Sequence, residues 1–155
     1  FRRVSLMRDI KSGGSAATAT TLRGTKAVLV TSPSGTFVAD EEINQATTGA
    51  VGKVVEWDSS NNILYYIQTR FNDAGCDANG NLTAFSGTNA ISAPGSSASA
   101  TPSASSTTVD SVVFTSGYNS GEMDADTGDV MYVENRSPIT RAADQTENVK
   151  LIIEF

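Results

Sequence analysis

Histidine is absent from this sequence of 155 residues, and cysteine occurs only once, as Cys76. Without histidine, the chain lacks the commonest general base near neutral pH and the commonest metal ligand. One cysteine cannot form an internal disulfide, which fits a protein made in a reducing cytosol. No run approaches the roughly 18 apolar residues that a membrane helix needs, and no apolar signal-peptide core follows Phe1. These absences predict a protein with no membrane partner and no histidine-based catalytic or metal site.

The composition favours strands over helices. Hydrophobic residues make up 39% of the chain and charged residues 18%, both below the usual globular share. Ser, Thr, Ala, Gly and Asn fill the difference, and Ser, Thr and Asn compete for backbone hydrogen bonds inside helices. No segment shows a helical period, so we predict one all-β domain over residues 1–155, a β-sandwich or distorted barrel with long loops.

Charge is divided unevenly along the chain. Residues 1–26 hold six basic and one acidic side chain, whereas residues 27–155 hold five basic and sixteen acidic ones. The basic segment is expected to pair with the acidic remainder of its own fold, and the alternative is that it faces an acidic partner. No nucleic-acid partner is expected, because the acidic remainder would repel phosphate.

A hairpin at residues 50–68 is the clearest strand signal. Two β-rich runs, 50–57 and 63–68, are separated by five polar residues, and Gly52 marks a candidate bulge in the first run. Because the sequence opens within a strand-like run, we expect the chain to be a fragment of a longer protein. Further strands are predicted at residues 1–10, 26–31, 109–116, 130–134 and 148–155, the last with Val149, Leu151, Ile153 and Phe155 on one face.

Residues Ser86–Thr108 are almost wholly Ser, Ala, Thr, Gly and Pro. Such a composition has few apolar side chains whose burial would offset the entropy lost on ordering the segment. We therefore predict a surface excursion that does not contribute to the core.

Several residue patterns resemble functional sites but lack residues that those sites require. The acidic loops at residues 77–81 and 122–129 lack the Gly and Glu that an EF-hand needs at its sixth and twelfth positions. No serine stands in a G-x-S-x-G elbow. Trp57, Tyr65 and Tyr66 flank the predicted hairpin, where packing is expected and a carbohydrate-binding face is the alternative. We predict no catalytic residue, no metal ligand and no cofactor.

The last 28 residues carry the most specific pattern, G-D-V-M-Y-V-E-N-R-S-P-I, then D-Q-T-E, then a terminal strand that ends in Phe. This pattern closely resembles the C-terminus of the T-even-type baseplate wedge subunit encoded by gene eight. The residues that carry the resemblance, and that are our candidate structural or interface motif, are Gly128, Tyr132, Glu134, Asn135, Arg136, Pro138, Asp144, Gln145, Thr146, Glu147 and Phe155.

The resemblance implies a structural component of a phage tail baseplate wedge, which acts in virion assembly and is not an enzyme. It also implies contacts with other baseplate wedge proteins, a homodimer, and a place in the virion tail baseplate after assembly in the host cytoplasm. The alternative function is a receptor- or glycan-binding module on the virion surface.

The resemblance covers the two ends of the chain, because the opening residues FRRVSL are similar to a strand upstream of the motif in that family. Residues 13–126 exceed what the family has there, which predicts an inserted β subdomain followed by the family motif at 127–155. Within the motif, Arg136 offers five fixed donors to carboxylates such as Asp144. We expect Arg136 to brace the link before the terminal strand, and the alternative is a docking surface.

Overall fold

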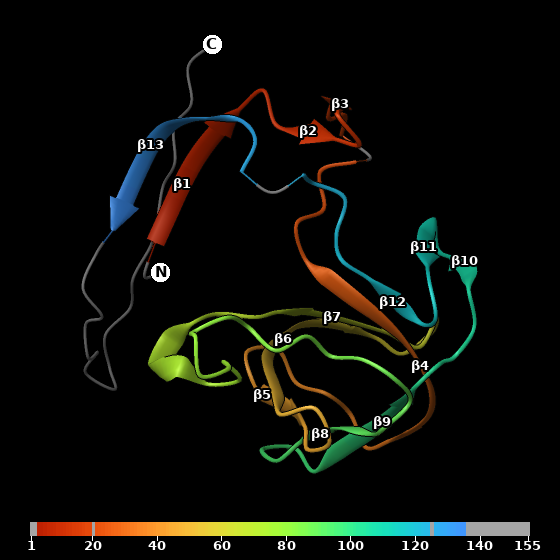
Figure 1. Ribbon diagram of the computed structural model, residues 1–155. Coiled ribbons are helices and arrows are strands. Elements are labelled where there is room, and N and C mark those ends of the chain that lie inside the picture. The colour runs from red at the N-terminus through yellow and green to blue at the C-terminus, as the bar shows by residue number, and fades with distance from the viewer. Residues whose placement is uncertain (1–2, 20, 125, 136–155) are drawn as a thin grey trace, which may run out of the picture.

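The computed structural model describes residues 3–19, 21–124 and 126–135, and these form an all-β molecule (Figure 1). Six strands close into a barrel, which confirms the predicted fold class. The order around the barrel is β4-β7-β6-β5-β8-β9, and β9 pairs back onto β4. The barrel strands are β4 (Lys26–Ser34), β5 (Glu42–Gln45), β6 (Ala50–Asp58), β7 (Ile63–Ile67), β8 (Ile91–Ala93) and β9 (Ala98–Pro102).

The remaining elements lie outside the barrel wall. A short strand, β12, pairs with β4 next to β9, and two hairpins, β2–β3 and β10–β11, form separate two-stranded sheets. Strands β1 and β13, the first and last in the described part of the chain, pair with each other in an antiparallel ribbon. The bounds are β1 (Arg3–Arg8), β2 (Lys11–Ser12), β3 (Ser15–Ala16), η1 (Phe71–Asp73), β10 (Thr107–Val109), β11 (Val112–Phe114), β12 (Tyr118–Asn119) and β13 (Asp129–Asn135).

The predicted hairpin at residues 50–68 is present as β6 and β7. Its turn is held by Asp58, whose carboxylate accepts hydrogen bonds from the backbone N–H of Ser60 at 2.9 Å and of Asn61 at 3.2 Å. The bulge lies between Val54 and Glu56, not at Gly52. Gly52 has a different role, since a Cβ at this position would lie 2.9 Å from the carbonyl oxygen of Ile67.

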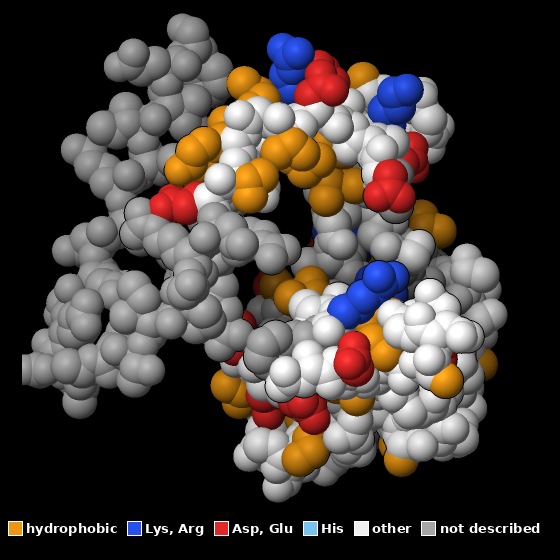
Figure 2. Space-filling model, turned by 60° about the vertical axis from the view of Figure 1, so that its left-hand side comes forward, with side chains coloured by type: hydrophobic (Ala, Val, Ile, Leu, Met, Phe, Trp, Pro, Cys, Tyr) orange, Lys and Arg blue, Asp and Glu red, His pale blue; other side chains and the backbone are white. Residues whose placement is uncertain are grey.

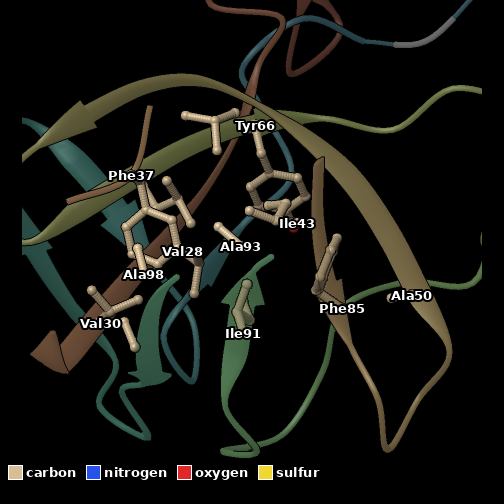
Figure 3. Packing of buried hydrophobic residues seen from close by; sticks show 13 residues of the cluster. Val28, Val30, Phe37, Ile43, Ala50, Tyr66, Phe85, Ile91, Ala93 and Ala98 are labelled. Carbon is tan, nitrogen blue, oxygen red and sulfur yellow. The ribbon is translucent and has the colours of Figure 1, made fainter. Parts of the chain in front are cut away.

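Small and large side chains pack together inside the barrel (Figure 3). A mixture of small and large side chains fills a narrow barrel without overpacking it. The core cluster consists of Val28, Val30, Phe37, Ile43, Ala50, Val54, Leu64, Tyr66, Phe85, Ile91, Ala93, Ala98 and Ala100. A second cluster, Ala27, Ile63, Val112 and Phe114, lies where the hairpin β10–β11 covers the outer face of β4 and β7.

The prediction that Ser86–Thr108 is a surface excursion is wrong. This segment supplies β8 and β9, which complete the barrel, and Ile91, Ala93, Ala98 and Ala100 are buried in its core. The barrel wall passes close to these residues, since a Cβ at Gly35 would lie 3.1 Å from the Cα of Ala98. Small side chains are required at such a close approach, and backbone pairing on both sides offsets the entropy of ordering them.

The expected strands at the start of the chain and at residues 130–134 are both present, and they are neighbours in space. Leu6 of β1 lies opposite Tyr132 of β13, and Met7 lies opposite Val130, with a register shift between the two pairs. The predicted strand at residues 148–155 lies outside the described residues.

Candidate functional site

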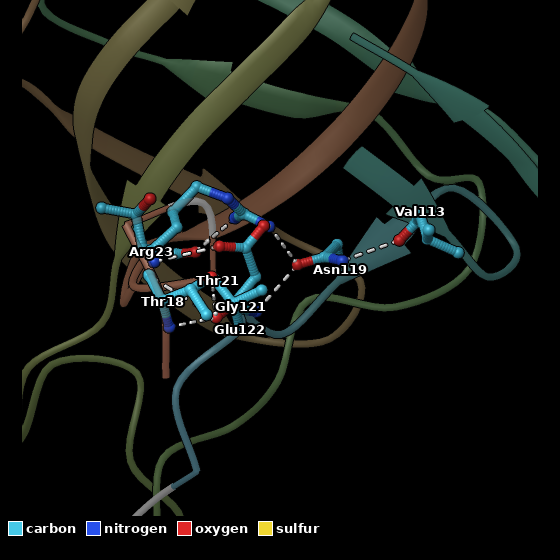
Figure 4. A network of polar contacts seen from close by, with 8 residues as sticks. Thr18, Thr21, Arg23, Val113, Asn119, Gly121 and Glu122 are labelled. Atoms are coloured by element: carbon cyan, nitrogen blue, oxygen red, sulfur yellow. Dashed lines mark hydrogen bonds and ion pairs between the residues drawn. The ribbon is translucent and has the colours of Figure 1, made fainter. Parts of the chain in front are cut away.

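The chain passes twice between the β1–β13 ribbon and the barrel, and side chains of these two connections hold each other (Figure 4). The backbone N–H of Arg23 donates to the Glu122 carboxylate at 3.1 Å, and the backbone N–H of Glu122 donates to the Arg23 carbonyl at 2.7 Å. The Arg23 guanidinium lies 3.7 Å from the same carboxylate. We call Arg23, Asn119 and Glu122 the neck clamp, because they join the two connections where these leave the barrel.

The other donors of Arg23 fix the clamp to the barrel. The guanidinium donates to the carbonyl of Thr25 and to the side-chain oxygen of Asn119, both at 2.7 Å. Asn119 in turn donates to the carbonyl of Val113 at 2.7 Å. The guanidinium also lies 5.7 Å from the ring centre of Tyr65. The exposed fractions of Arg23 and Glu122 are only 19% and 25%, so solvent screens this pair incompletely.

A groove opens beside the clamp, bounded among others by Arg23, Glu56, Asp58, Tyr65 and Asp110. Burial raises the pKa of the Tyr65 hydroxyl, and the nearby Arg23 charge opposes this shift. The hydrogen bonds from Asn61 lower the pKa of Asp58. Across residues 3–19, 21–124 and 126–135, no three His, Cys, Asp or Glu side chains converge in a way that could hold a metal ion.

The acidic turn at residues 122–129 distributes its carboxylates among separate partners. Asp124 accepts hydrogen bonds from the backbone N–H groups of Gly13 at 3.0 Å and Gly14 at 2.7 Å. Asp129 accepts a hydrogen bond from Arg8 at 3.3 Å. Of the basic side chains in the N-terminal segment, Arg8 and Arg23 pair with the later acids Asp129 and Glu122, whereas Lys26 donates to the amide oxygen of Gln68. The absence of a calcium site stays a prediction.

Gln45, the last residue of β5, has a fully buried polar side chain. Its amide donates to the carbonyl of Asn89 at 2.7 Å, and its oxygen accepts hydrogen bonds from the Ser86 N–H at 3.0 Å and the Thr48 hydroxyl at 2.9 Å. Burial raises the pKa of the neighbouring Tyr118, and its hydrogen bond with Gln45 opposes the shift. Gln45 thus fixes the loop that leads into β8.

The aromatic side chains of the hairpin are used for packing within the fold. Trp57 lies against Phe37 with ring centres 5.3 Å apart, and Tyr66 lies against Phe85 at 5.0 Å, both edge to face. These contacts favour the packing interpretation over a carbohydrate-binding face.

The structure describes four of the predicted motif residues. Gly128 has a φ of +87°, and a Cβ there would lie 2.9 Å from the carbonyl oxygen of Arg8, so glycine is required on both counts. The Tyr132 hydroxyl donates to the Glu134 carboxylate at 3.3 Å, and the backbone of Asn135 pairs with that of β1. The other motif residues, Arg136, Pro138, Asp144, Gln145, Thr146, Glu147 and Phe155, lie outside the described residues.

Sequence reasoning did not identify the neck clamp or Gln45. The uneven charge distribution indicated that Arg23 and Glu122 would find partners within the fold, but it could not pair these two in particular. Gln45 gave no signal, because an isolated glutamine next to another polar residue, Asn44, looks like a surface residue.

Comparison with known families bears on the part of the chain that contains β13. The sequence model of the phage Gp8 family, described as Bacteriophage T4, Gp8, matches residues 79–155. The C-terminal half of this chain belongs to the Gp8 family of baseplate wedge subunits. The chain is therefore a phage baseplate structural protein by family, and its place is the tail baseplate of the virion.

The family match begins at residue 79, inside the segment 13–126 that we expected to be an insertion. Family likeness therefore extends into the barrel and includes β8 and β9. Comparisons with curated proteins and with solved structures gave no match. In the described part of the chain, no helix has the length and apolar character needed to cross a membrane.

Proposed function

We propose that this protein acts in assembly of the baseplate wedge, where it binds other wedge proteins through β surfaces. The observation that carries the proposal is the exposed apolar surface of β13, the strand of the ribbon that lies within the family match. Val130, Met131, Tyr132 and Val133 are consecutive, and each is more than half exposed. Large apolar patches that a monomer leaves exposed commonly mark protein contacts.

The barrel gives the ribbon a rigid base. Its interior is packed, and the neck clamp and the Asp124 contacts fix the two connections to the ribbon. We propose that residues 13–126, which contain the barrel, are a β subdomain that holds the family motif at a defined place in the wedge, and that only the part before residue 79 is an insertion relative to the family. Because a binding patch on a rigid element loses little entropy on docking, such an arrangement favours stable assembly.

We propose further that the protein forms a homodimer and assembles in the host cytoplasm, as the family implies. Its role needs no catalytic residue. Arg136 would brace the link between β13 and the terminal strand, and Arg136→Ala should then lower the melting temperature of the chain. An unchanged melting temperature combined with lost wedge binding would favour docking by Arg136 instead.

The test is co-expression of the protein with the other wedge proteins, followed by size-exclusion chromatography and electron microscopy. Val130→Lys should prevent entry into the wedge complex, because a charge would be buried in the contact. Val113→Lys is the matched control, since Val113 is 61% exposed and Val130 is 59% exposed. Val113 lies on the barrel hairpin, so its variant should assemble normally.

Equal assembly of the two variants would overturn the ribbon as the contact. Failure of the unchanged protein to enter any wedge complex, combined with binding on a glycan array, would instead favour the receptor-binding alternative.

A further inference from the structure

In the part of the chain that the structure describes, no buried apolar cluster joins the β1–β13 ribbon to the barrel. The two apolar clusters contain residues of the barrel, its loops and the hairpin β10–β11, and neither contains a residue of the two connections. Leu22 and Met123, which lie in these connections, are 45% and 38% exposed. Figure 2 shows the ribbon above the barrel, joined to it among the described residues by a narrower region. Because a region with few buried apolar contacts opens locally at a low free-energy cost, the contacts within the connections decide how firmly the ribbon is held.

Glu122 forms the first set of contacts, at the barrel end of the connections. Its carboxylate accepts a hydrogen bond from the backbone N–H of Arg23 at 3.1 Å and lies 3.7 Å from the Arg23 guanidinium. The same guanidinium donates to Asn119 of β12 at 2.7 Å, and β12 pairs with β4, so Arg23 is anchored to the barrel. The two backbones also approach closely, since a Cβ at Gly121 would lie 3.3 Å from the Arg23 carbonyl oxygen. Glu122 therefore ties the connection after β12 to the connection before β4.

Asp124 forms the second set of contacts, further along the same connection. One of its carboxylate oxygens accepts a hydrogen bond from the Gly13 N–H at 3.0 Å, and the other accepts one from the Gly14 N–H at 2.7 Å. Successive N–H groups in a turn conformation form a concavity that suits an anion, and both glycines have a positive φ, +58° and +78°. The Asp124 N–H donates to the carbonyl of Lys11 at 2.8 Å. The Asp124 carboxylate thus holds the turn between β2 and β3, which follows β1 in the chain.

The contacts nearer the ribbon do not depend on a carboxylate. The Lys11 N–H donates to the Thr127 hydroxyl at 3.2 Å, and a Cβ at Gly128 would lie 2.9 Å from the carbonyl oxygen of Arg8. These contacts lie at the ribbon end of the connections and would move with the ribbon. The two carboxylates therefore stand between the part of the chain that is fixed to the barrel and the part that is fixed to the ribbon.

We propose that the carboxylates of Glu122 and Asp124 form a latch between the ribbon and the barrel. While both are bound, they hold the ribbon in one orientation, and when they are released the ribbon turns relative to the barrel while both sheets stay folded. A hinge needs only a few residues outside regular strands to change conformation, and Glu122 and Asp124 stand in such a segment, between β12 and β13. Carboxylates suit the role, because charge-assisted hydrogen bonds are about twice as strong as neutral ones and yet are easily exchanged for water at an accessible site. The latch concerns the orientation of the ribbon, whether or not the ribbon binds wedge proteins.

A distance measured between two spin labels by pulsed electron paramagnetic resonance tests the latch on the full 155-residue chain. One label is placed on Ser5→Cys in β1 and the other on Ser59→Cys in the turn between β6 and β7, and both positions are exposed. Cys76→Ser removes the native thiol from this background. The chain that retains both carboxylates should give one narrow distance distribution between the ribbon and the barrel.

The double variant with Glu122→Gln and Asp124→Asn should broaden this distribution by about twofold or more, because each amide lacks the charge and keeps only one acceptor oxygen. Each single variant should broaden it less. Asp126→Asn is the matched control, since Asp126 is an exposed carboxylate of the same connection, and it should leave the distribution unchanged. Circular dichroism should show the cooperative thermal transition of the barrel in every variant, because the core lies outside the connections.

A distribution that stays narrow in the double variant would overturn the proposal, as would a broad distribution in the chain that retains both carboxylates. Loss of the barrel transition in the double variant and in both single variants would also overturn it, since the carboxylates would then stabilise the barrel itself and not the orientation of the ribbon. None of these measurements involves wedge assembly, so the proposed function can fail while this inference holds, and the reverse.

Discussion

The barrel and the β1–β13 ribbon contain similar residues but bury them very differently. In the barrel, side chains as small as Ala93 and Ala98 are almost completely buried, whereas in the ribbon Val130 and Tyr132 are more than half exposed. The difference in burial arises because the barrel is a closed sheet and the ribbon is not. A closed sheet has no edges and encloses its inner side chains whatever their size, but two strands enclose nothing.

The comparison shows that burial follows topology more than it follows hydrophobicity. The segment with the fewest large apolar residues completes the core, and the most apolar stretch of β13 remains on the surface. An exposed apolar stretch in a molecule with a well-packed core is typical of a protein–protein contact surface.

Replacement of residues 86–106 by a Gly-Ser linker should have the largest effect. It removes β8 and β9, opens the barrel and exposes Ile43 and its neighbours, so we expect loss of cooperative thermal unfolding followed by circular dichroism. The control is replacement of residues 77–81, an exposed turn, by a linker of equal length, which should leave the transition in place. A folded barrel without β8 and β9 would show that closure is not what stabilises the core.

Gln45→Leu should lower the free energy of unfolding by about 2 kcal/mol, because the Ser86 N–H and the Asn89 carbonyl lose their partner. Denaturant unfolding measures this loss. Asn44→Leu is the control, since this neighbour is only partly buried. Equal effects of the two substitutions would indicate that the hydrogen bonds of the Gln45 side chain contribute little to stability.

Gly128→Ala should act on the ribbon alone. The positive φ and the close approach to the Arg8 carbonyl together should lower the stability of the ribbon by about 1–3 kcal/mol. This loss should be measurable as faster hydrogen exchange in β1 and β13. Gly14→Ala is the control, because Gly14 has a φ of +78° and nothing within 4 Å of a Cβ. A drop in barrel stability with Gly128→Ala would show that the two regions are coupled.

Glu122→Gln should cost about 1 kcal/mol, since the neck clamp is less than one third exposed but retains its backbone hydrogen bonds. A double-mutant cycle with Arg23→Met should give a coupling free energy of a similar size. Glu56→Gln, which faces the same groove, is expected to change stability by less than about 0.5 kcal/mol. A coupling free energy of zero would show that the Arg23–Glu122 ion pair does not stabilise the neck clamp.

The smallest effect should be that of pH on the loop at residues 77–81. Backbone hydrogen bonds from Asn81 and Asn79 lower the pKa of Asp77. A lowered pKa in the folded state means that the carboxylate stabilises the loop above its unfolded pKa of about 3.9, and that this contribution is lost as pH falls through the folded value. A carboxyl titration by NMR should therefore give a midpoint below that of a model peptide. A midpoint at or above the peptide value would contradict the hydrogen bonds.

The hairpin at residues 50–68 could be predicted because its signals are local. Alternating β-branched residues and a polar turn that Asp58 caps specify two strands without reference to the rest of the chain. Strands β8 and β9 could not be predicted in this way, because their apolar residues are mostly alanine. Only the narrow interior formed by the other four barrel strands makes alanine a suitable core residue.

The candidate site also contains features that the sequence predicted and features that only the folded chain shows. The uneven charge distribution predicted pairing between the basic N-terminal segment and later acids, but Arg23 and Glu122 are brought together only where two distant connections leave the barrel. Gly128 was found through the family motif, and its physical reason, the approach of the Arg8 carbonyl, is visible only in the folded chain.

By itself, the sequence determined the all-β class, the central hairpin, the pairing tendency of its charges and the Gp8 family. These properties depend on local propensity, on total composition or on a contiguous motif, each of which one chain segment carries alone. Tertiary structure decided the closure of the barrel, the burial of the segment at residues 86–108, the neck clamp and the exposure of the ribbon. Each of these is a contact between residues far apart in sequence, and its energy depends on geometry that exists only after the strands have taken their places.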